Sequence, residues 1–286
     1  MKLKFKKNWS LFALLFVTVI SSCSKNNVAD PYPTTVAVTG KKSLKTVSNA
    51  TFGTVITDGD GRTLYFFSVD ANGSSGCTGG CETAWPVFLA DDLSSMPGLN
   101  ATDVSTITRT DGKKQTTYKG WPLYYYAGDV APLDVKGDAS GGTWFVAKPD
   151  YSVMLASTQL VGNDGKNYLE NSKPGDGSTQ YLTDASGRTL YAFAPDTYNV
   201  NTYTKADLSN NNTWPIYESD VLNVPSVLSK NVFSQITVAG KKQLTYKGHP
   251  LYYFGPDAKR GDTKGVSVPS PGVWPILTKS TIALNP

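Results

Sequence analysis

The sequence is poor in the residues that carry most metal, redox and hydrolytic chemistry. Its 286 residues include three Cys, three Met and one His. Hydrolases of the Ser-His-Asp and Cys-His types need a histidine base, copper sites favour His and Met, and no glycine-rich phosphate loop opens a helix. We therefore expect no catalytic residue, no metal site, no cofactor and no enzyme activity.

Long hydrophobic runs are also missing. The run from Leu11 to Ile20 is shorter than the ~20 residues that a membrane-spanning helix needs. It follows a lysine-rich start and precedes Ser21-Ser22-Cys23, an order typical of a secretion signal. We predict a signal peptide over residues 1–22.

The end of this signal resembles a bacterial lipobox. In Ile20-Ser21-Ser22-Cys23 the cysteine stands where such a signal is cut and the new N-terminal Cys is acylated. We expect a lipid on Cys23 to anchor the protein to a membrane, with a flexible tether over residues 23–45. The predicted location is the bacterial cell envelope, either periplasmic or surface-exposed. The alternative is an ordinary signal peptide with an incidental cysteine.

The charge balance excludes one class of partner. The chain has 27 basic and 23 acidic residues, but four of the lysines precede Leu11 and leave with the signal. The mature chain is therefore close to neutral, with 23 basic residues against 23 acidic ones. Because no basic stripe remains, we expect no nucleic-acid partner.

Two cysteines remain after Cys23 is assigned to the anchor. An oxidising compartment favours a short-loop disulfide between Cys77 and Cys81. A metal site is the alternative, but two thiolates lack the further ligands of a zinc or iron site, and no His lies nearby.

The most informative feature of the chain is a motif that occurs four times. It reads Gly-x-x-Leu-Tyr-x4-Asp, has an aromatic residue two positions after the Tyr, and is followed by a Trp. We call the copies units 1 to 4. Their Gly, Tyr, second aromatic, Asp and Trp are Gly61, Tyr65, Phe67, Asp70 and Trp85; Gly120, Tyr124, Tyr126, Asp129 and Trp144; Gly187, Tyr191, Phe193, Asp196 and Trp214; and Gly248, Tyr252, Phe254, Asp257 and Trp274.

The single histidine occupies a variable position of this motif. The residue after the glycine is His249 in unit 4, but Arg62, Trp121 and Arg188 in the other units. This variability argues against a catalytic or metal-binding role for His249.

The four units form two larger repeats. The string Asp60–Tyr65 matches Ser186–Tyr191, and Gln115–Tyr125 matches Gln243–Tyr253. We predict two β repeat domains, over residues 46–150 and 151–286. The predicted fold class is all-β, with a tandem antiparallel sandwich or barrel-like repeat in each half; one propeller-like assembly of four β units is the alternative.

Turn signals between β-branched runs predict several hairpins. The expected turns are Asp58–Gly61, Asp111-Gly112, Asn163–Gly165 and Ala239-Gly240. Two segments, Asp91–Met96 and Ser219–Leu228, are candidates for short helices.

The motif side chains favour a structural role. Strand alternation places Tyr65 and Phe67 on one face, and we expect each Trp to pack on this face of its own unit. The recurring acids Asp70, Asp129, Asp196 and Asp257 are interpreted as turn formers that accept backbone N–H groups. Calcium ligation and catalysis by a carboxylate pair are the alternatives. We expect the surplus aromatic residues to fill the core rather than to stack on ligands.

At these residues the chain resembles a family of secreted repeat lipoproteins with a Tyr-x-(Phe/Trp/Tyr)-x-x-Asp motif. All four units fit the motif, over about residues 50–280. The pairs Gly137-Asp138 and Gly261-Asp262 also fit, whereas the second half has no Cys pair and carries Thr197–Asn212 instead. No function is established for that family, so the resemblance implies a location more than an activity.

The expected function is a non-enzymatic binding or structural module of the cell envelope. Its expected partners are a membrane, through the lipid, and a glycan or an envelope protein. Two alternatives remain: an accessory of extracytoplasmic electron or metal transfer, and an enzyme acting on polysaccharide.

Overall fold

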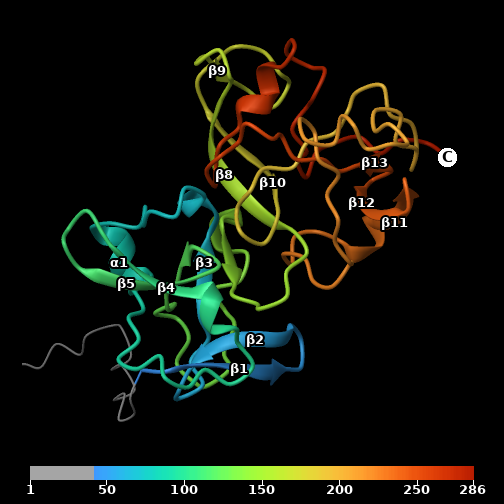
Figure 1. The fold of residues 1–286 in the computed structure, drawn as a ribbon. Helices are drawn as coiled ribbons and strands as arrows, with labels where there is room; N and C mark the ends of the chain where they lie inside the picture. The colour runs from blue at the N-terminus through green and yellow to red at the C-terminus, as the bar shows by residue number, and fades with distance from the viewer. Residues whose placement is uncertain (1–41) are drawn as a thin grey trace, which may run out of the picture. The chain divides into compact units, whose positions relative to one another are not determined.

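The structure is a computed structural model that describes residues 42–286 (Figure 1). The predicted signal peptide, Cys23 and the tether up to residue 41 lie outside the described residues. The described residues belong to one compact unit. The first strand begins at Leu44, which is fully buried, two residues before the predicted start of the first β repeat domain. The boundary between residues 150 and 151 stays a prediction.

The chain forms short strands and almost no helix. The strands are β1 (Leu44–Asn49), β2 (Gly53–Asp58), β3 (Tyr65–Phe67), β4 (Val104–Thr108), β5 (Lys114–Tyr118), β6 (Trp121–Pro122), β7 (Trp144–Val146), β8 (Met154–Val161), β9 (Asn167–Tyr168), β10 (Ser178–Thr183), β11 (Phe233–Val238), β12 (Lys241–Tyr246) and β13 (His249–Pro250). Within residues 42–286 the one α-helix is α1 (Gly80–Ala84), and short 3-10 turns occur at η1 (Ser68–Asp70), η2 (Ala101–Asp103), η3 (Ser140–Gly142), η4 (Lys230–Val232) and η5 (Lys264–Ser267).

The strands pair into small antiparallel sheets. Their orders are β1-β2, β3-β7, β4-β5-β6, β10-β8-β9 and β11-β12-β13. The all-β, antiparallel, tandem-repeat prediction is confirmed. In the described part of the chain these sheets stay open, since none closes into a barrel and none has the four strands of a propeller blade.

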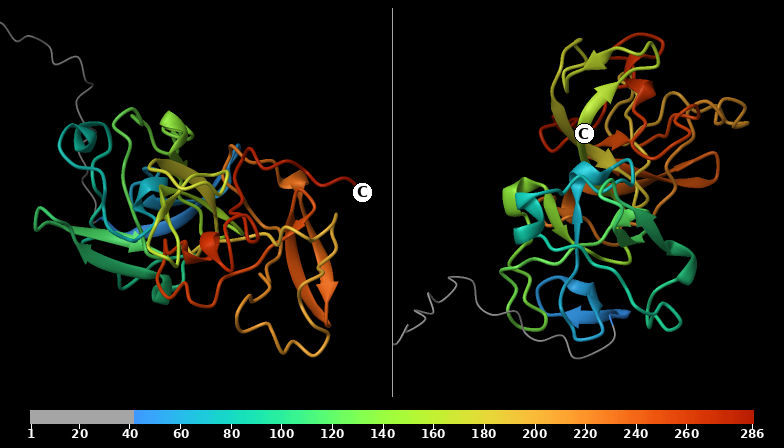
Figure 2. Two further views of the ribbon diagram at one scale, coloured as in Figure 1. Left: turned by 90° about the horizontal axis from the view of Figure 1, so that it is seen from above. Right: turned by 90° about the vertical axis from the view of Figure 1, so that its left-hand side faces the viewer.

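Three of the predicted hairpins are present. Strands β4-β5, β8-β9 and β11-β12 each pair across the expected turn. Figure 2 shows the β4-β5 hairpin (green) and the β11-β12 hairpin (orange) as separate ribbons, one from each half. The predicted turn at Asp58–Gly61 is also present, because the N–H of Asp58 donates to the carbonyl of Arg62 and that of Leu64 donates to the carbonyl of Ile56, both at 3.0 Å. The pairing across this turn is short, while β2 pairs mainly with β1, and β3 pairs with β7. The motif strand is therefore shared with a later segment, which local turn chemistry does not reveal.

Both helix candidates were wrong. In Asp91–Met96 the Asp92 carboxylate accepts the N–H of Ser94 at 2.8 Å and stabilises a turn. In Ser219–Leu228, Asn223 bridges to Tyr151 in an extended conformation. Short polar side chains that bond nearby backbone compete with helix formation.

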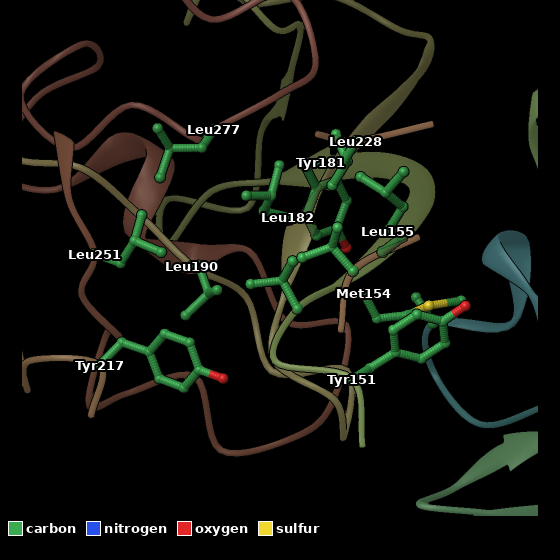
Figure 3. Close-up of a cluster of buried hydrophobic side chains, with 14 of the residues drawn as sticks. Tyr151, Met154, Leu155, Tyr181, Leu182, Leu190, Tyr217, Leu228, Leu251 and Leu277 are labelled. Atoms are coloured by element: carbon green, nitrogen blue, oxygen red, sulfur yellow. The ribbon is translucent and has the colours of Figure 1, made fainter. Parts of the chain in front are cut away.

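In the first half the hydrophobic core separates along the two faces of the motif strand, whereas in the second half the motif tyrosines and tryptophans belong to one large cluster. Leu64 and Phe66 join this large cluster, which draws on both halves, whereas Tyr65 lies in a second cluster with Trp85 and Trp144. The expected two-sided burial of this strand is thus present. Figure 3 shows part of the large cluster, where side chains of β8 and β10 (Met154, Leu155, Tyr181 and Leu182) lie near Leu190 and Leu251 of units 3 and 4.

Polar contacts also connect the two halves. The Nε1 of Trp121 donates to the carbonyl of Ala185 at 2.9 Å, and the Nε of Arg260 donates to the carbonyl of Ala71 at 2.8 Å. The Arg260 guanidinium lies over the Trp121 ring at 4.6 Å. Trp121 is fully buried, so it is a core residue and does not present a ring to a ligand, as expected for the aromatic surplus.

Candidate functional site

The two units of each half pair through their motif tyrosines. The backbone N–H of Tyr65 donates to the carbonyl of Tyr124 at 2.8 Å, and that of Tyr124 donates to Tyr65 at 3.1 Å. In the second half Tyr191 and Tyr252 exchange the same two bonds, at 2.8 and 2.9 Å. Each half is therefore built around a local two-fold relation between its units.

The side chains of these tyrosines cross to the other unit. The Tyr65 hydroxyl donates to the Asp129 carboxylate at 2.6 Å, and the Tyr124 hydroxyl donates to Asp70 at 2.6 Å. In the second half the Tyr191–Asp257 and Tyr252–Asp196 distances are both 2.7 Å. All eight residues are buried. Thus the Tyr and the Asp of one motif copy are not hydrogen-bonded to each other. Each bonds the Asp or the Tyr of the paired unit.

The second oxygen of each aspartate makes the loop contact expected from the sequence. Asp70 accepts the N–H of Gly76 at 2.7 Å and Asp129 that of Lys136 at 2.9 Å. In the second half the donors are the N–H groups of Thr202, at 2.7 Å, and Lys264, at 3.0 Å. These donors lie six or seven residues beyond the Asp. The interpretation of these aspartates as turn formers is therefore correct for one oxygen of each carboxylate. It missed the tyrosine hydroxyl that donates to the other oxygen.

The tryptophans stack between the units. The Trp85 and Trp144 rings are 3.8 Å apart and parallel to within 1°, and Trp214 and Trp274 are 3.7 Å apart at 7°. Each Trp meets the Tyr of its own unit edge-on, at 5.1 to 5.5 Å. The second aromatic residue crosses over: Phe67 stacks on Trp144. The prediction that each Trp packs on the aromatic face of its own unit is confirmed for the motif Tyr. It was wrong for the second aromatic residue, which packs on the Trp of the paired unit.

The crossover gives each half a stack of four rings. The order is Phe67, Trp144, Trp85, Tyr126 in the first half and Phe193, Trp274, Trp214, Phe254 in the second. We call these the first and second aromatic stacks.

Close backbone approach to each stack requires glycine. A Cβ at Gly137 would lie 2.8 Å from the Trp85 ring, and one at Gly265 would lie 2.9 Å from Trp214. Both N–H groups also donate to a motif tyrosine oxygen, at 3.3 Å to Tyr65 and 3.2 Å to Tyr191. The structural counterpart of Gly137 is therefore Gly265. Gly261, which the sequence motif suggested, instead lies against Ala71 of the first half.

A further Tyr–Asp set escaped the sequence analysis. The hydroxyl of Tyr125 donates to Asp58 at 2.8 Å, and that of Tyr253 donates to Asp184 at 2.9 Å. Each aspartate also accepts two N–H groups of its own turn. The available signal was that Tyr-Tyr doublets occur only in units 2 and 4, while an Asp three residues before the motif Gly occurs only in units 1 and 3.

The first half carries a buried arginine beside its disulfide. Cys77 and Cys81 form the predicted disulfide. Arg109 donates to the Cys77 carbonyl at 2.9 Å and to Gln115 at 3.0 Å, and it pairs with Glu82. It also donates to Ser75, which bonds the Tyr124 hydroxyl at 2.7 Å. Arg109 thus connects the disulfide loop to the Tyr124–Asp70 pair.

The second half lacks both the cysteine pair and the counterpart of Arg109. Val238 stands where Arg109 lies in the matching β-hairpin. The amide of Asn201 supplies the missing donor, bonding Gln243, the counterpart of Gln115, at 2.7 Å. The Asn/Thr-rich loop Thr197–Asn212 is therefore a neutral substitute for the disulfide loop, so the loss of the Cys pair leaves the Tyr–Asp exchange intact.

Burial changes the proton affinity of the exchanged carboxyls. Desolvation raises the pKa of Asp70 and of Asp257 to about 7, against the lowering effect of their Tyr hydrogen bonds. Desolvation also raises the pKa of Asp129 and Asp196. The pKa of each motif tyrosine is raised far above its usual range by burial, with its carboxylate partner adding to the shift.

Comparison with known proteins agrees with this repeat structure. A family described as a secreted repeat of unknown function matches residues 46–88, 105–148 and 236–278. Three segments of the chain are therefore similar to this secreted repeat. The matched segments hold the motif strands of units 1, 2 and 4. No curated protein and no solved structure matches the chain.

The geometry shows that unit 3 has the same contacts as the matched units. Unit 3 lies outside the matched segments, yet Tyr191, Asp196 and Trp214 make the same exchanged contacts as their counterparts in unit 1. The repeats therefore occur as two pairs, and unit 3 completes the second pair.

A groove lies beside the second repeat pair. This groove, of about 430 Å³, is lined by apolar residues, including Leu169, Ile276 and Leu277, and by as many polar ones, among them Glu170 and His249. The Glu170 carboxylate accepts the hydroxyls of Thr278, at 2.6 Å, and Ser280. Its size is within the range of small-molecule sites. Within the described chain no group of three or more His, Cys, Asp or Glu side chains is arranged to hold a metal ion.

Proposed function

We propose that the protein is a lipid-anchored component of the bacterial cell envelope whose secreted repeats form a non-enzymatic structural or binding module. The observation that carries the proposal is the exchange of motif side chains. Every motif Tyr, Asp and Trp is buried and contacts the paired unit. Residues committed to such contacts stabilise a scaffold, and they face no substrate.

The location is supported at a coarser level by the family. A secreted repeat indicates an extracellular or envelope position, and the lipobox-like Ile20–Cys23 motif favours attachment through Cys23. Among residues 42–286 there is no helix with the length and apolar character needed to cross a bilayer.

The groove beside the second repeat pair is the site at which binding is most readily tested. Its apolar walls and the Glu170 carboxylate at its edge suit an amphiphilic ligand with a hydroxylated or cationic head, such as a glycan fragment or a lipid head group. The purified mature chain is titrated with peptidoglycan fragments, neutral glycans and phospholipid micelles, while binding and ligand breakdown are both followed.

The matched variants are Leu169→Glu and Leu222→Glu. Leu169 is a half-buried groove residue, whereas Leu222 is 52% exposed and lies outside the groove. We expect saturable binding of one ligand class without turnover, weakened at least tenfold by Leu169→Glu and unchanged by Leu222→Glu. Turnover of a polysaccharide that is lost on substituting an acidic residue would instead support the enzyme alternative and overturn the proposal.

An accessory role in extracytoplasmic electron transfer is the second candidate. One observation favours it: each half contains a pair of parallel indole rings. Such a pair can take part in electron transfer, which a purely structural role does not need.

A further inference from the structure

A half-buried tyrosine lies against the pair of parallel indoles in each half: Tyr126 belongs to the first aromatic stack, whereas Tyr203 lies outside the second stack and meets its Trp274 edge-on. In the first half the Tyr126 ring lies 4.5 Å from Trp85, which is 3.8 Å from Trp144. In the second half Tyr203 lies 4.8 Å from Trp274, which is 3.7 Å from Trp214. Both tyrosines are partly exposed, while all four tryptophans are buried.

The two half-buried tyrosines come from different places in the sequence. Tyr126 is the second aromatic residue of unit 2, but its counterpart in unit 4 is Phe254, and Tyr203 comes from the loop that replaces the disulfide loop. Unit 4 has Phe254 at the place of Tyr126, so phenylalanine satisfies the packing there, whereas the Tyr203 hydroxyl also interacts with the Asn210 side chain. The same chemical group nevertheless reaches the edge of both stacks by two routes.

A buried tyrosine with a base lies at each indole. Tyr65 meets Trp85 edge-on at 5.4 Å, and Tyr124 meets Trp144 at 5.1 Å. Their hydroxyls donate to Asp129 and Asp70 at 2.6 Å. Because burial raises the pKa of these two carboxyls, each is a better proton acceptor than a surface aspartate.

This arrangement satisfies the requirements of one-electron aromatic oxidation. Two indoles in parallel contact share the positive charge of a radical cation, which makes the pair easier to oxidise than one ring. A phenol loses an electron readily only when its proton leaves as well, and a hydrogen-bonded carboxylate receives that proton without diffusion. Short ring-to-ring distances then allow rapid electron transfer between the groups.

We propose that each pair of secreted repeats is a one-electron relay, in which a high-potential metal complex at the surface, acting as a one-electron outer-sphere oxidant, withdraws an electron from the indole pair. The electron tunnels past the ring of Tyr126 or Tyr203, which is not itself oxidised. The oxidant gains one electron, and the indole pair becomes a radical cation. Tyr65 or Tyr124 then gives its electron to the indoles and its proton to its aspartate. The products are the reduced oxidant, a neutral tyrosyl radical and a protonated carboxyl. The relay does not depend on ligand binding in the groove.

Flash-quench oxidation tests the relay directly. A photogenerated ruthenium(III) polypyridyl complex serves as the oxidant, and radicals are followed by transient absorption and electron paramagnetic resonance. The main variant replaces the four motif tyrosines (Tyr65, Tyr124, Tyr191 and Tyr252) by Phe, which keeps the rings and removes the hydroxyls. The control is Tyr198→Phe, at a tyrosine that is 38% exposed and is not a member of either stack.

The expected result is a tryptophan radical that decays as a tyrosyl radical appears, with slower transfer in D2O. The four-residue variant should keep the tryptophan radical and lose at least four-fifths of the tyrosyl yield, whereas Tyr198→Phe should retain it. If the four-residue variant does not fold, the wild-type chain provides the test: acidification protonates the acceptors and should lower the tyrosyl yield. The proposal is overturned if the four-residue variant gives the same tyrosyl yield as Tyr198→Phe. It is also overturned if the tyrosyl yield of the wild type does not depend on pH.

Discussion

Replacing Trp144 by alanine is expected to lower the free energy of unfolding by about 4 kcal/mol, the cost of deleting a large buried aromatic side chain. Trp144 is 5% exposed and contacts Phe67 and Trp85 face to face and Tyr124 edge-on. The deletion therefore removes contacts from both units of the first half. Denaturant unfolding followed by circular dichroism measures the loss.

Two controls show whether the stack acts as one unit. Tyr198→Ala removes an aromatic ring that is 38% exposed, and we expect a loss below about 1 kcal/mol. The double variant Trp85→Ala/Trp144→Ala should lose clearly less than the sum of the two single losses, because both singles remove the same ring contact. Additive losses would mean that the two indoles stabilise the fold independently.

Stability is expected to fall between about pH 4 and pH 7, the opposite of the usual behaviour of salt-bridged acids. Asp70 and Asp257 have an ordinary pKa of 3.8 when unfolded and about 7 when folded. Between these values the folded state holds protons that the unfolded state has lost, so raising the pH favours unfolding. The stability due to these carboxyls is full below about pH 4 and is lost as pH rises through about 7. One pKa unit corresponds to about 1.4 kcal/mol, so two carboxyls give a decrease of several kcal/mol.

Surface acids act in the other direction but over a different range. Hydrogen bonds and nearby lysines lower the pKa of Asp111, Asp134 and Asp220, so their contribution rises with pH and is complete above about pH 4. The check is unfolding free energy against pH for the wild type and for Asp70→Asn/Asp257→Asn. The neutral amides should flatten the curve between pH 4 and 7; a wild-type curve that rises over this range would contradict the assignment.

The sequence predicted the units and their local contacts but not their exchange. Repetition identified four copies and their pairing into halves, and turn chemistry located the hairpins at Asp111-Gly112 and Ala239-Gly240. These features depend on residues close together in the chain. The partner of Tyr65 is 64 residues away, and a motif that contains both Tyr and Asp gives no indication of which copy each one serves.

The remaining differences have the same origin. The asparagine that replaces Arg109 in the second half comes from a loop with no matching sequence, so only the three-dimensional position reveals the substitution. Similarly, β3 pairs with β7, which begins at Trp144, and no local turn signal connects two strands so far apart. Pairing across long separations is set by the packing of the complete half, which local patterns do not encode.

The most direct test of the exchanged architecture is a pair of double-mutant cycles on Tyr65. One cycle combines Tyr65→Phe with Asp129→Asn, and the other combines Tyr65→Phe with Asp70→Asn, each measured by denaturant unfolding. A hydrogen bond to a buried carboxylate gives a coupling energy of about 1.5–3 kcal/mol. The structure predicts this coupling for Tyr65 with Asp129 and a much smaller one for Tyr65 with Asp70, the aspartate of its own motif. A dominant coupling between Tyr65 and Asp70 would mean that each repeat closes on itself and would contradict the exchange between units.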